Sequence, residues 1–218
     1  MGLRCWRCRQ IAPLCVCQLL QTFDHPTRLA LVLHRGEAFK PTNTGHLATR
    51  CLRGSQRLIT GQGAPLQLIA GRAAVLFPSD DAVELSPTTA PEVLVVPDGT
   101  WPQAKRLVKR DPLLQGLPRV KLPNAIAVGH RLRRNPRPDG LMTLEAIAVA
   151  YGAMGAPEIE RTLLDLFRVV AERTLYMRGQ LAADQVTGGV PRGFSTENIS
   201  AKWRGPVQLC VGQPKVMV

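Results

Sequence analysis

One stretch decides the fold: Val93-Leu94-Val95-Val96-Pro97-Asp98-Gly99-Thr100-Trp101-Pro102-Gln103-Ala104. Its first four residues are apolar and three of them are β-branched, which predicts a buried strand of a parallel sheet that stops at Pro97. Asp98 and Gly99 then form a tight turn, because both residue types favour turns. A helix is predicted to follow, since Thr100 is a good N-cap and Gln103 stands at the capping-box spacing from it.

The predicted helix has a basic face and an apolar face. The apolar face consists of Trp101, Ala104, Leu107 and Val108. Asp98 therefore stands at the carboxyl end of a strand and beside a helix N-terminus. That edge of an open α/β sheet binds ligands, and the helix N-terminus offers free N–H groups with a partial positive charge. Asp98 is thus a candidate binding or catalytic acid, and the alternative is that it only caps or turns the chain.

The composition indicates a basic globular protein. The chain has 218 residues, which suits one core-forming domain with a small appendage. It carries 28 Lys and Arg against 16 Asp and Glu, a net charge of +12 and a pI of about 10.2. Such a charge favours polyanions, of which nucleic acid is the commonest, although charge alone does not choose between RNA, DNA and anionic lipid. Only 5% of the residues are aromatic, which argues against a wide base-stacking platform.

No membrane segment is expected, because the sequence has no apolar run of about 18 residues. Cysteines stand near the N-terminus, where a signal peptide would need an apolar core. We therefore predict a cytoplasmic protein with reduced thiols. The sequence carries no signal of an oligomeric state.

Four cysteines near the N-terminus have the spacing Cys5-x2-Cys8-x6-Cys15-x-Cys17. A Cys-x-x-Cys pair and a second close pair can complete a tetrahedral thiolate site, so the pattern predicts structural zinc with no open coordination position. The alternatives are unrelated thiols or a redox pair. Cys51 and Cys210 are isolated in the sequence and are interpreted as packing residues.

A second strand-to-helix loop gathers polar side chains. A strand is predicted over residues 29–33, and His34-Arg35-Gly36-Glu37 follows it. Residues 42–44 are all N-cap types and lead into a helix that Gly54 ends. Asn43 and its neighbours therefore gather at another strand end and helix start. His34 is interpreted as a structural histidine rather than a catalytic one.

The remaining elements complete an α/β pattern. Further strands are predicted over residues 66–69, 73–77 and 119–122, and residues 84–92 are predicted to form a connecting loop. A buried helix should follow residue 141, with Thr143 as the N-cap and Glu145 in the first turn. Glu145 there is more often an acid that offsets the helix dipole than a catalytic acid. An amphipathic helix is predicted over residues 157–177, and an irregular tail follows it.

The span 130–140 is rich in arginine and cannot form a core. Arginine suits phosphate geometry, so a contact with an RNA backbone is one interpretation and a solvated loop is the other. The arginines concerned are Arg131, Arg133, Arg134 and Arg137.

Four blocks in this order resemble the DTW-domain family, the tRNA-uridine aminocarboxypropyltransferases. They are the cysteine block, His34 to Glu37 with Asn43-Thr44-Gly45, the Pro97 to Trp101 segment with Gln103-Ala104, and Leu132-Arg133 with Thr143-Leu144-Glu145-Ala146. Together they cover about residues 5 to 150. The family is named for Asp-Thr-Trp, and here Gly99 lies between Asp98 and Thr100.

The resemblance implies a SPOUT-like, knotted fold with a mostly parallel sheet flanked by helices. It also implies transfer of the aminocarboxypropyl group of S-adenosylmethionine to N3 of a uridine in tRNA, with methylthioadenosine as the other product. The expected domains are a cysteine zinc-binding element over residues 1–22, a catalytic domain over 23–180 and an irregular tail over 181–218. The alternatives are a methyltransferase of RNA on the same fold and a non-enzymatic zinc-containing RNA-binding protein.

The resemblance, together with the positions and charges of the residues, suggests roles for individual side chains. Asp98 matches the signature acid and is the candidate base. The expected cofactor pocket consists of Phe77, Pro78, Asp98, Gly99, Thr100, Trp101, Leu141, Thr143 and Glu145. The expected RNA contacts are Lys40, Asn43, Thr44 and the four arginines of span 130–140.

Overall fold

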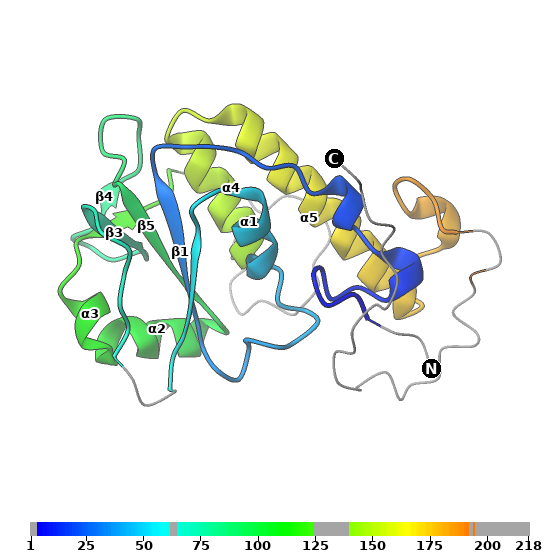
Figure 1. The fold of residues 1–218 in the computed structure, drawn as a ribbon, viewed down its shortest axis with the longest axis horizontal. Coiled ribbons are helices and arrows are strands. Elements are labelled where there is room, and N and C mark those ends of the chain that lie inside the picture. The colour runs from blue at the N-terminus through cyan, green and yellow to red at the C-terminus, as the bar shows by residue number, and fades with distance from the viewer. Residues whose placement is uncertain (1–3, 62–64, 124–139, 192–193, 195–218) are drawn as a thin grey trace, which may run out of the picture. The chain divides into compact units, whose positions relative to one another are not determined.

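The computed structural model describes residues 4–61, 65–123, 140–191 and 194. The described chain divides into two compact units (Figure 1). The described residues between 20 and 167 form the larger unit, and the described residues up to 19 together with those from 168 onward form the smaller one. These units are groups of residues that pack together, and the sequence boundaries expected after residues 22 and 180 remain a prediction.

The larger unit is built on a six-stranded sheet with the order β2-β1-β5-β3-β6-β4, and every neighbouring pair is parallel. The strands are β1 Arg28–Leu33, β2 Gln56–Ile59, β3 Ala73–Leu76, β4 Val83–Glu84, β5 Val93–Asp98 and β6 Arg119–Lys121. All of β5 and nearly all of β1 are buried, as expected for apolar runs in the middle of a parallel sheet. The predicted parallel α/β architecture is confirmed, and the knot remains a prediction.

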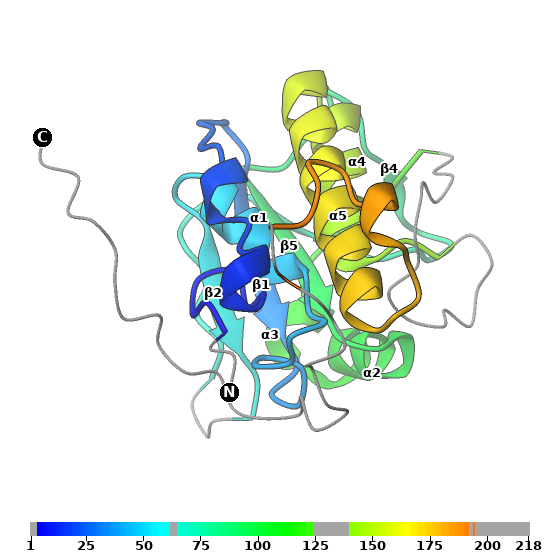
Figure 2. The same ribbon diagram turned by 90° about the vertical axis from the view of Figure 1, so that its right-hand side faces the viewer.

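Helices cover the sheet on both faces (Figure 2). The helices are α1 Gly45–Cys51, α2 Trp101–Arg110, α3 Pro112–Gln115, α4 Thr143–Ala153 and α5 Pro157–Met177. Val108 of α2 and Leu114 of α3 pack against one face of the sheet, on side chains that include Val32 and Val95. Alternate residues of a strand point to opposite faces. The neighbours of these valines therefore face α1 and α4, which Figure 2 shows in front of the sheet.

The strand β5 continues past the point where the sequence predicted its end. Pro97 pairs with Val32 and Asp98 pairs with Leu33, so both belong to β5. The backbone carbonyl of Asp98 accepts a hydrogen bond from the N–H of His34 at 3.0 Å, so Asp98 bonds toward β1 and Pro97 faces the β3 side. The pairing of β5 with β3 ends at Val95. Proline is tolerated there because no ladder bond needs its missing N–H.

The prediction of a strand over residues 66–69 was wrong, and the strand β2 was not predicted. Leu66, Leu68 and Ile69 still pack on the core, but their backbone is irregular. The side chain of Gln56 replaces a strand neighbour for this segment. Its Oε1 accepts from the N–H of Ile69 at 3.0 Å, and its Nε2 donates to the carbonyl of residue 67 at 2.8 Å.

The helix α2 starts as predicted, with one difference. The backbone N–H of Thr100 donates to Gln103 Oε1 at 2.7 Å, which is half of the expected capping box. Trp101 was predicted on the buried face, but 38% of its surface is exposed. Ala104 and Val108 are the two buried residues of α2.

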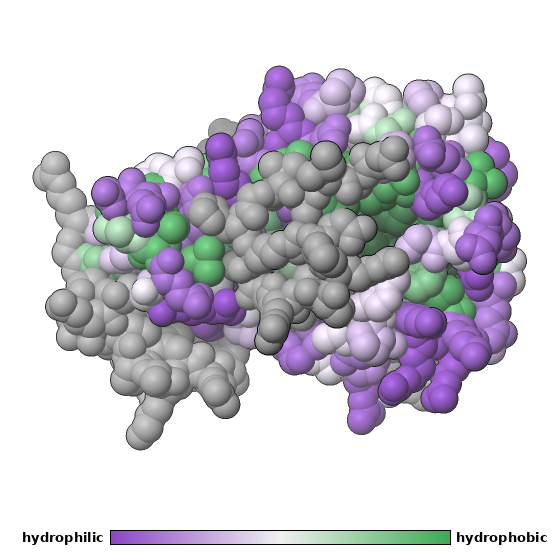
Figure 3. Space-filling model, turned by 180° about the vertical axis from the view of Figure 1, so that it is seen from behind, coloured by the Kyte–Doolittle hydropathy of each residue, from purple (hydrophilic) through white to green (hydrophobic). Residues whose placement is uncertain are grey.

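The later helices follow the sequence closely. The predicted bounds of α5 are confirmed, and α4 is buried almost all round. Its N-cap is Met142 rather than the predicted Thr143, which is the first helical residue. None of the helices within the described ranges is long and apolar enough to cross a lipid bilayer. On the face drawn in Figure 3, hydrophilic and hydrophobic side chains are interspersed, as on the surface of most folded domains.

The smaller unit contains the cysteine segment, the last turns of α5 and the chain that follows. Its short 3₁₀ helices are η1 Ala12–Leu14, η2 Cys17–Leu19 and η3 Ala183–Gln185. Its core consists of Ile11, Leu14, Tyr176 and Val186. One part of the region predicted as an irregular tail therefore carries a helical turn and a core residue.

Candidate functional site

A buried carboxylate lies where three elements of the larger unit meet. Asp98, the last residue of β5, is only 4% exposed. Its Oδ2 accepts a hydrogen bond from Asn43 Nδ2 at 2.6 Å, and its Oδ1 accepts one from Thr143 Oγ1 at 2.7 Å. Asn43 precedes α1, and Thr143 is the first residue of α4. The structure thus brings together three residues that the sequence singled out on separate loops.

The position of Gly45 depends on its having no side chain. A Cβ atom at this residue would lie 2.8 Å from Asp98 Oδ2 and 2.9 Å from Thr143 Cγ2. Any larger residue would therefore push the start of α1 away from the carboxylate. The sequence motif contained Gly45, but its role at the site was missed because the contact is made across the fold.

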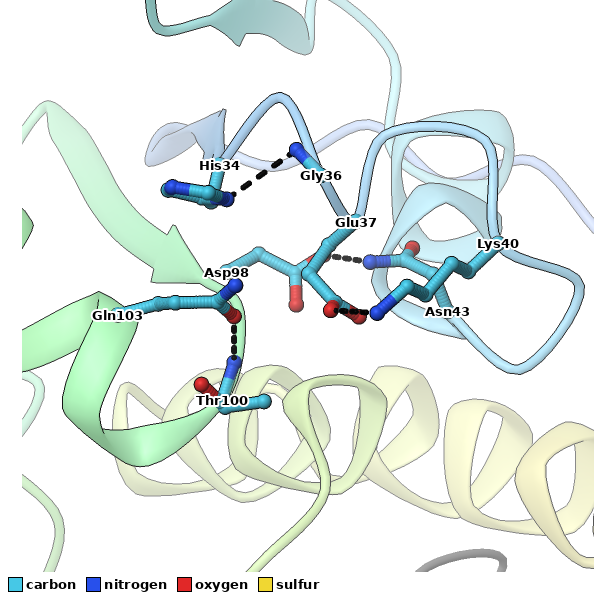
Figure 4. Close-up of polar contacts among 8 residues, drawn as sticks. All are labelled: His34, Gly36, Glu37, Lys40, Asn43, Asp98, Thr100 and Gln103. Atoms are coloured by element: carbon cyan, nitrogen blue, oxygen red, sulfur yellow. Dashed lines mark hydrogen bonds and ion pairs between the residues drawn. The ribbon is translucent and has the colours of Figure 1, made fainter.

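A second buried acid, Glu37, lies beside this group (Figure 4). Glu37 is completely buried, and its Oε1 forms an ion pair with Lys40 Nζ at 2.5 Å. The Lys40 side chain is half exposed. Figure 4 shows Glu37 and Lys40 next to Asn43 and Asp98. The sequence placed Glu37 in a motif but did not name it as a site residue, because local sequence does not reveal burial.

The loop after β1 is closed by its own histidine. His34 Nδ1 accepts a hydrogen bond from the backbone N–H of Gly36 at 3.1 Å. The N–H groups of Glu37 and Ala38 both donate to the carbonyl of His34. These contacts fit the structural role predicted for His34, and they hold Glu37 in its buried position.

An aromatic pair stands at the same edge of the sheet. The rings of Phe77 and Trp101 stack with their centroids 5.2 Å apart and their planes inclined by 14°. The two residues follow β3 and β5, which are neighbours in the sheet. Both were predicted for the cofactor pocket. The other predicted pocket residues on these loops are Pro78, Gly99, Thr100 and Leu141, and the roles of all of them remain predictions.

The carboxylate of Glu145 binds the backbone at the start of its own helix, α4. Its Oε2 accepts a hydrogen bond from the backbone N–H of Met142 at 2.8 Å. This contact occupies the acid at the start of α4, as expected for a residue that offsets the helix dipole. A cofactor contact by Glu145 would have to share the carboxylate with that bond.

Two buried polar atoms near Asp98 lack hydrogen-bond partners among the described residues. They are Asn43 Oδ1 and Thr44 Oγ1, whose residues are 4% and 3% exposed. Buried polar groups are nearly always satisfied in proteins, and exceptions often mark a missing ligand or water. Because Asn43 already donates to Asp98, its carbonyl oxygen is oriented and remains available as an acceptor.

Part of the predicted RNA surface lies outside the described residues. This part consists of Arg131, Arg133, Arg134 and Arg137, which the structure does not describe. Lys40 is described and presents a half-exposed cation, whereas Asn43 and Thr44 are buried against the Asp98 group.

The four N-terminal cysteines lie in one cluster. The Sγ atoms of Cys5, Cys8, Cys15 and Cys17 all lie within 4.8 Å of one another. The Sγ atoms of Cys5 and Cys17 are 3.5 Å apart, and those of Cys8 and Cys15 are 3.6 Å apart. Four sulfur ligands at this spacing can hold a metal ion and fill a tetrahedral shell.

The backbone around the first cysteine pair, Cys5 and Cys8, forms a tight turn. The N–H of Arg9 donates to the carbonyl of Cys5 at 2.7 Å, and Arg9 has a positive φ of 63°. Burial raises the pKa of the Cys5 thiol, but backbone hydrogen bonds from Cys8 and Arg7 outweigh it and lower the pKa to about 7. Burial, together with the charges of the neighbouring Cys15 and Cys5, raises the pKa of the Cys8 thiol to about 12. The cluster therefore needs a cation before all its thiols can ionise.

Comparison with known proteins places these residues in a family context. The chain matches the family model described as DTW domain over residues 2–175. Three similar proteins share the name tRNA-uridine aminocarboxypropyltransferase 2. The one from Drosophila melanogaster is 30% identical over 74% of this chain and 70% of its own length. Those from Macaca fascicularis and Mus musculus are 28% and 26% identical over 73% of this chain, which spans 59% of their length.

One solved structure is also similar. It is the SAM-dependent rRNA:acp-transferase Tsr3 from Vulcanisaeta distributa, with a TM-score of 0.47 and 18% sequence identity. The match covers 74% of this chain and 84% of that chain.

Proposed function

The chain belongs to the DTW-domain family, and from this premise we propose that it is a tRNA-uridine aminocarboxypropyltransferase. The observation that carries the proposal is the family match over residues 2–175, which contains the whole Asp98 group. Relatives with this name match about three quarters of the chain.

The proposed donor is S-adenosylmethionine. When bound, it supplies an electrophilic carbon beside a sulfonium sulfur, and methylthioadenosine leaves when the carbon–sulfur bond breaks. The residues that would hold it are Trp101 and Phe77, as an apolar wall, and Asn43 and Thr44, whose unpaired buried oxygens suit polar groups of a ligand. This combination of apolar and polar groups fits a nucleoside linked to an amino acid.

Asp98 would act as the general base. It would take the proton from N3 of the uracil as N3 bonds to the carbon of the donor, and a positioned carboxylate contributes about 10²–10⁴-fold to such a step. Asn43 and Thr143 each donate to a different oxygen of this carboxylate, so both oxygens are held as acceptors at the site.

The residues around Asp98 would hold it in one orientation. Asn43 and Thr143 donate to different oxygens, so the plane of the carboxylate is fixed by two elements of the fold. Gly45 has no side chain, so the start of α1 can approach the carboxylate closely. Such preorganisation allows a base to react without first rearranging.

The proposed substrate is tRNA, which suits the net charge of +12. Arg131, Arg133, Arg134 and Arg137, with Lys40, would neutralise phosphates. Charge reversal at Arg133 and Arg134 should weaken tRNA binding and reduce the slope of its salt dependence. An unchanged slope would show that these two arginines do not contact the phosphates of tRNA.

Structural zinc is the metal proposed for Cys5, Cys8, Cys15 and Cys17. These four cysteines would fill all four coordination positions, so the metal would stabilise the smaller unit and take no part in the transfer. Metal analysis of protein purified in reducing buffer should find about one zinc per chain.

The test of the function is a reaction with purified components. Unmodified tRNA and S-adenosylmethionine are incubated with the protein, and the RNA is digested to nucleosides for mass spectrometry. A uridine that gains the aminocarboxypropyl group, together with released methylthioadenosine, is the expected result. A uridine that gains only a methyl group would show that the protein is an RNA methyltransferase instead. Bound but unchanged tRNA would favour a non-enzymatic RNA-binding protein.

A further inference from the structure

A buried cation lies against the backbone of the cysteine segment. Arg173, near the end of α5, is only 8% exposed. Its Nη1 donates to the carbonyl of Cys15 at 2.8 Å and to the carbonyl of Leu14 at 3.1 Å. Its Nε is buried and has no hydrogen-bond partner in the part of the chain that the structure describes. The two carbonyl acceptors are neutral, so they do not supply the full negative charge that a buried guanidinium needs.

The cysteine cluster can supply that charge. Four thiolates around a divalent metal ion leave a surplus of negative charge on the centre. The Arg173 guanidinium lies directly against one of these ligand residues, because its Nη1 donates to the carbonyl of Cys15. The adjacent acid, Glu172, accepts a hydrogen bond from the backbone N–H of Thr187 at 2.7 Å.

The contacts of α5 also fix the positions of the ligands. Cys15 is held through its carbonyl by Arg173, and the Cys15 Sγ lies 3.6 Å from that of Cys8. Between the two cysteine pairs in the sequence, Gln10 Nε2 donates to Thr174 Oγ1 at 3.4 Å. Arg173 and Thr174, which are consecutive in α5, therefore hold the cysteine segment at Cys15 and at Gln10.

We infer that Arg173 is the positioning and charge-balancing residue of a metal centre formed by the four cysteines. It fixes the backbone of Cys15 and offsets the surplus negative charge of the metal with its thiolates. Groups outside the ligand shell commonly change metal affinity by about 10–100-fold when they are removed. The inference rests on the proposed metal and does not depend on the transferase reaction.

The experiment measures metal retention in three variants of Arg173. Arg173→Met removes the charge and the donors, Arg173→Gln keeps a neutral donor, and Arg173→Lys keeps the charge. Arg161→Met is the matched control, because Arg161 is an exposed arginine on the same helix. The zinc-loaded full chain is mixed with a chromophoric chelator, and the equilibrium affinity and release rate are recorded. Cobalt loading then reports, by absorption, whether four thiolates still bind the metal.

Arg173→Met should bind zinc about 10–100-fold more weakly than the unchanged chain. Arg173→Gln should lose less than the methionine variant, and Arg173→Lys should lose least, while Arg161→Met should match the unchanged chain. The tetrahedral thiolate absorption of cobalt should persist in every variant that folds.

Unchanged zinc affinity in Arg173→Met would overturn the inference. If that variant does not fold, equal losses in Arg173→Gln and Arg173→Lys would overturn the charge-balancing role. A chain that takes up neither zinc nor cobalt would overturn the inference together with the metal, and the nucleoside assay would still decide the transferase proposal independently.

Discussion

Thr143 and Asp98 are 45 residues apart in the sequence and are joined by a hydrogen bond of 2.7 Å from Thr143 Oγ1 to Asp98 Oδ1. This bond connects the first residue of α4 to the last residue of β5. Asn43 makes the equivalent contact with the other oxygen from the chain before α1. The carboxylate therefore links three elements and is oriented by two of them.

Replacing Thr143 with valine should destabilise the fold and lower activity. Valine keeps the shape of threonine but leaves a buried carboxylate oxygen without its donor, at a cost of about 1–3 kcal/mol. Chemical denaturation measures the loss of stability, and single-turnover kinetics measures the effect on transfer. Thr143→Ser keeps the hydroxyl and is the control. Equal stability of the valine and serine variants would show that the bond contributes little.

Asp98→Asn should abolish most of the turnover while the chain stays folded. The amide has nearly the shape of the carboxylate but cannot accept the proton from N3, so the rate should fall by about 10²–10⁴-fold. The nucleoside assay measures the rate, and circular dichroism checks the fold. Wild-type turnover in this variant would exclude Asp98 as the base and favour a purely structural role.

Gly45→Ala should disturb the site through packing alone. The added Cβ would lie 2.8 Å from Asp98 Oδ2, so α1 or the carboxylate must move, at a cost of about 1–3 kcal/mol. Gly116→Ala is the matched control, because a Cβ there meets no atom closer than 3.8 Å and its φ is −78°. Thermal denaturation should separate the two variants, and identical melting would mean that the start of α1 adapts to the methyl group.

Trp101→Ala should weaken the binding of S-adenosylmethionine. The stack with Phe77 holds the indole in place as a wall of the proposed pocket. An aromatic contact of this kind with the ligand contributes about 0.5–1.5 kcal/mol, so its removal should lower the affinity by roughly 3–10-fold. Calorimetry with the cofactor alone measures this, and Trp101→Phe should retain most of the affinity. Val83→Ala is a control, because Val83 is 53% exposed on the edge strand β4. Unchanged affinity in Trp101→Ala would remove Trp101 from the proposed pocket.

The sequence predicted most of the central fold because local signals there are strong. The apolar run before Pro97 and the amphipathic pattern of α5 each identify one element without reference to the rest of the chain. Asp98, Asn43 and Thr143 were each singled out from local features, since each stands at a strand end or a helix start, although their mutual contact was not predicted. The carboxyl ends of parallel strands lie at one edge of a sheet, so such residues meet there.

Other features depend on contacts that local sequence does not encode. The strand β2 was not predicted, and the prediction of a strand over residues 66–69 was wrong. The backbone of that segment bonds to the side chain of Gln56, a contact that local sequence does not reveal. The burial of Glu37 depends on the loop that His34 closes. Trp101 was predicted inside because helical periodicity gives the face of a residue but not how far the sheet extends beneath it.

The core of the smaller unit has a consequence for the preparation of recombinant fragments. The match to the family model ends at residue 175, but the core formed by Ile11 and Leu14 is completed by Tyr176 and Val186. A fragment cut at the end of the family match would expose the two N-terminal side chains to water and invite aggregation. Expression trials of this chain should therefore extend beyond residue 194, so that the Tyr176 hydroxyl keeps its acceptor, the carbonyl of Phe194.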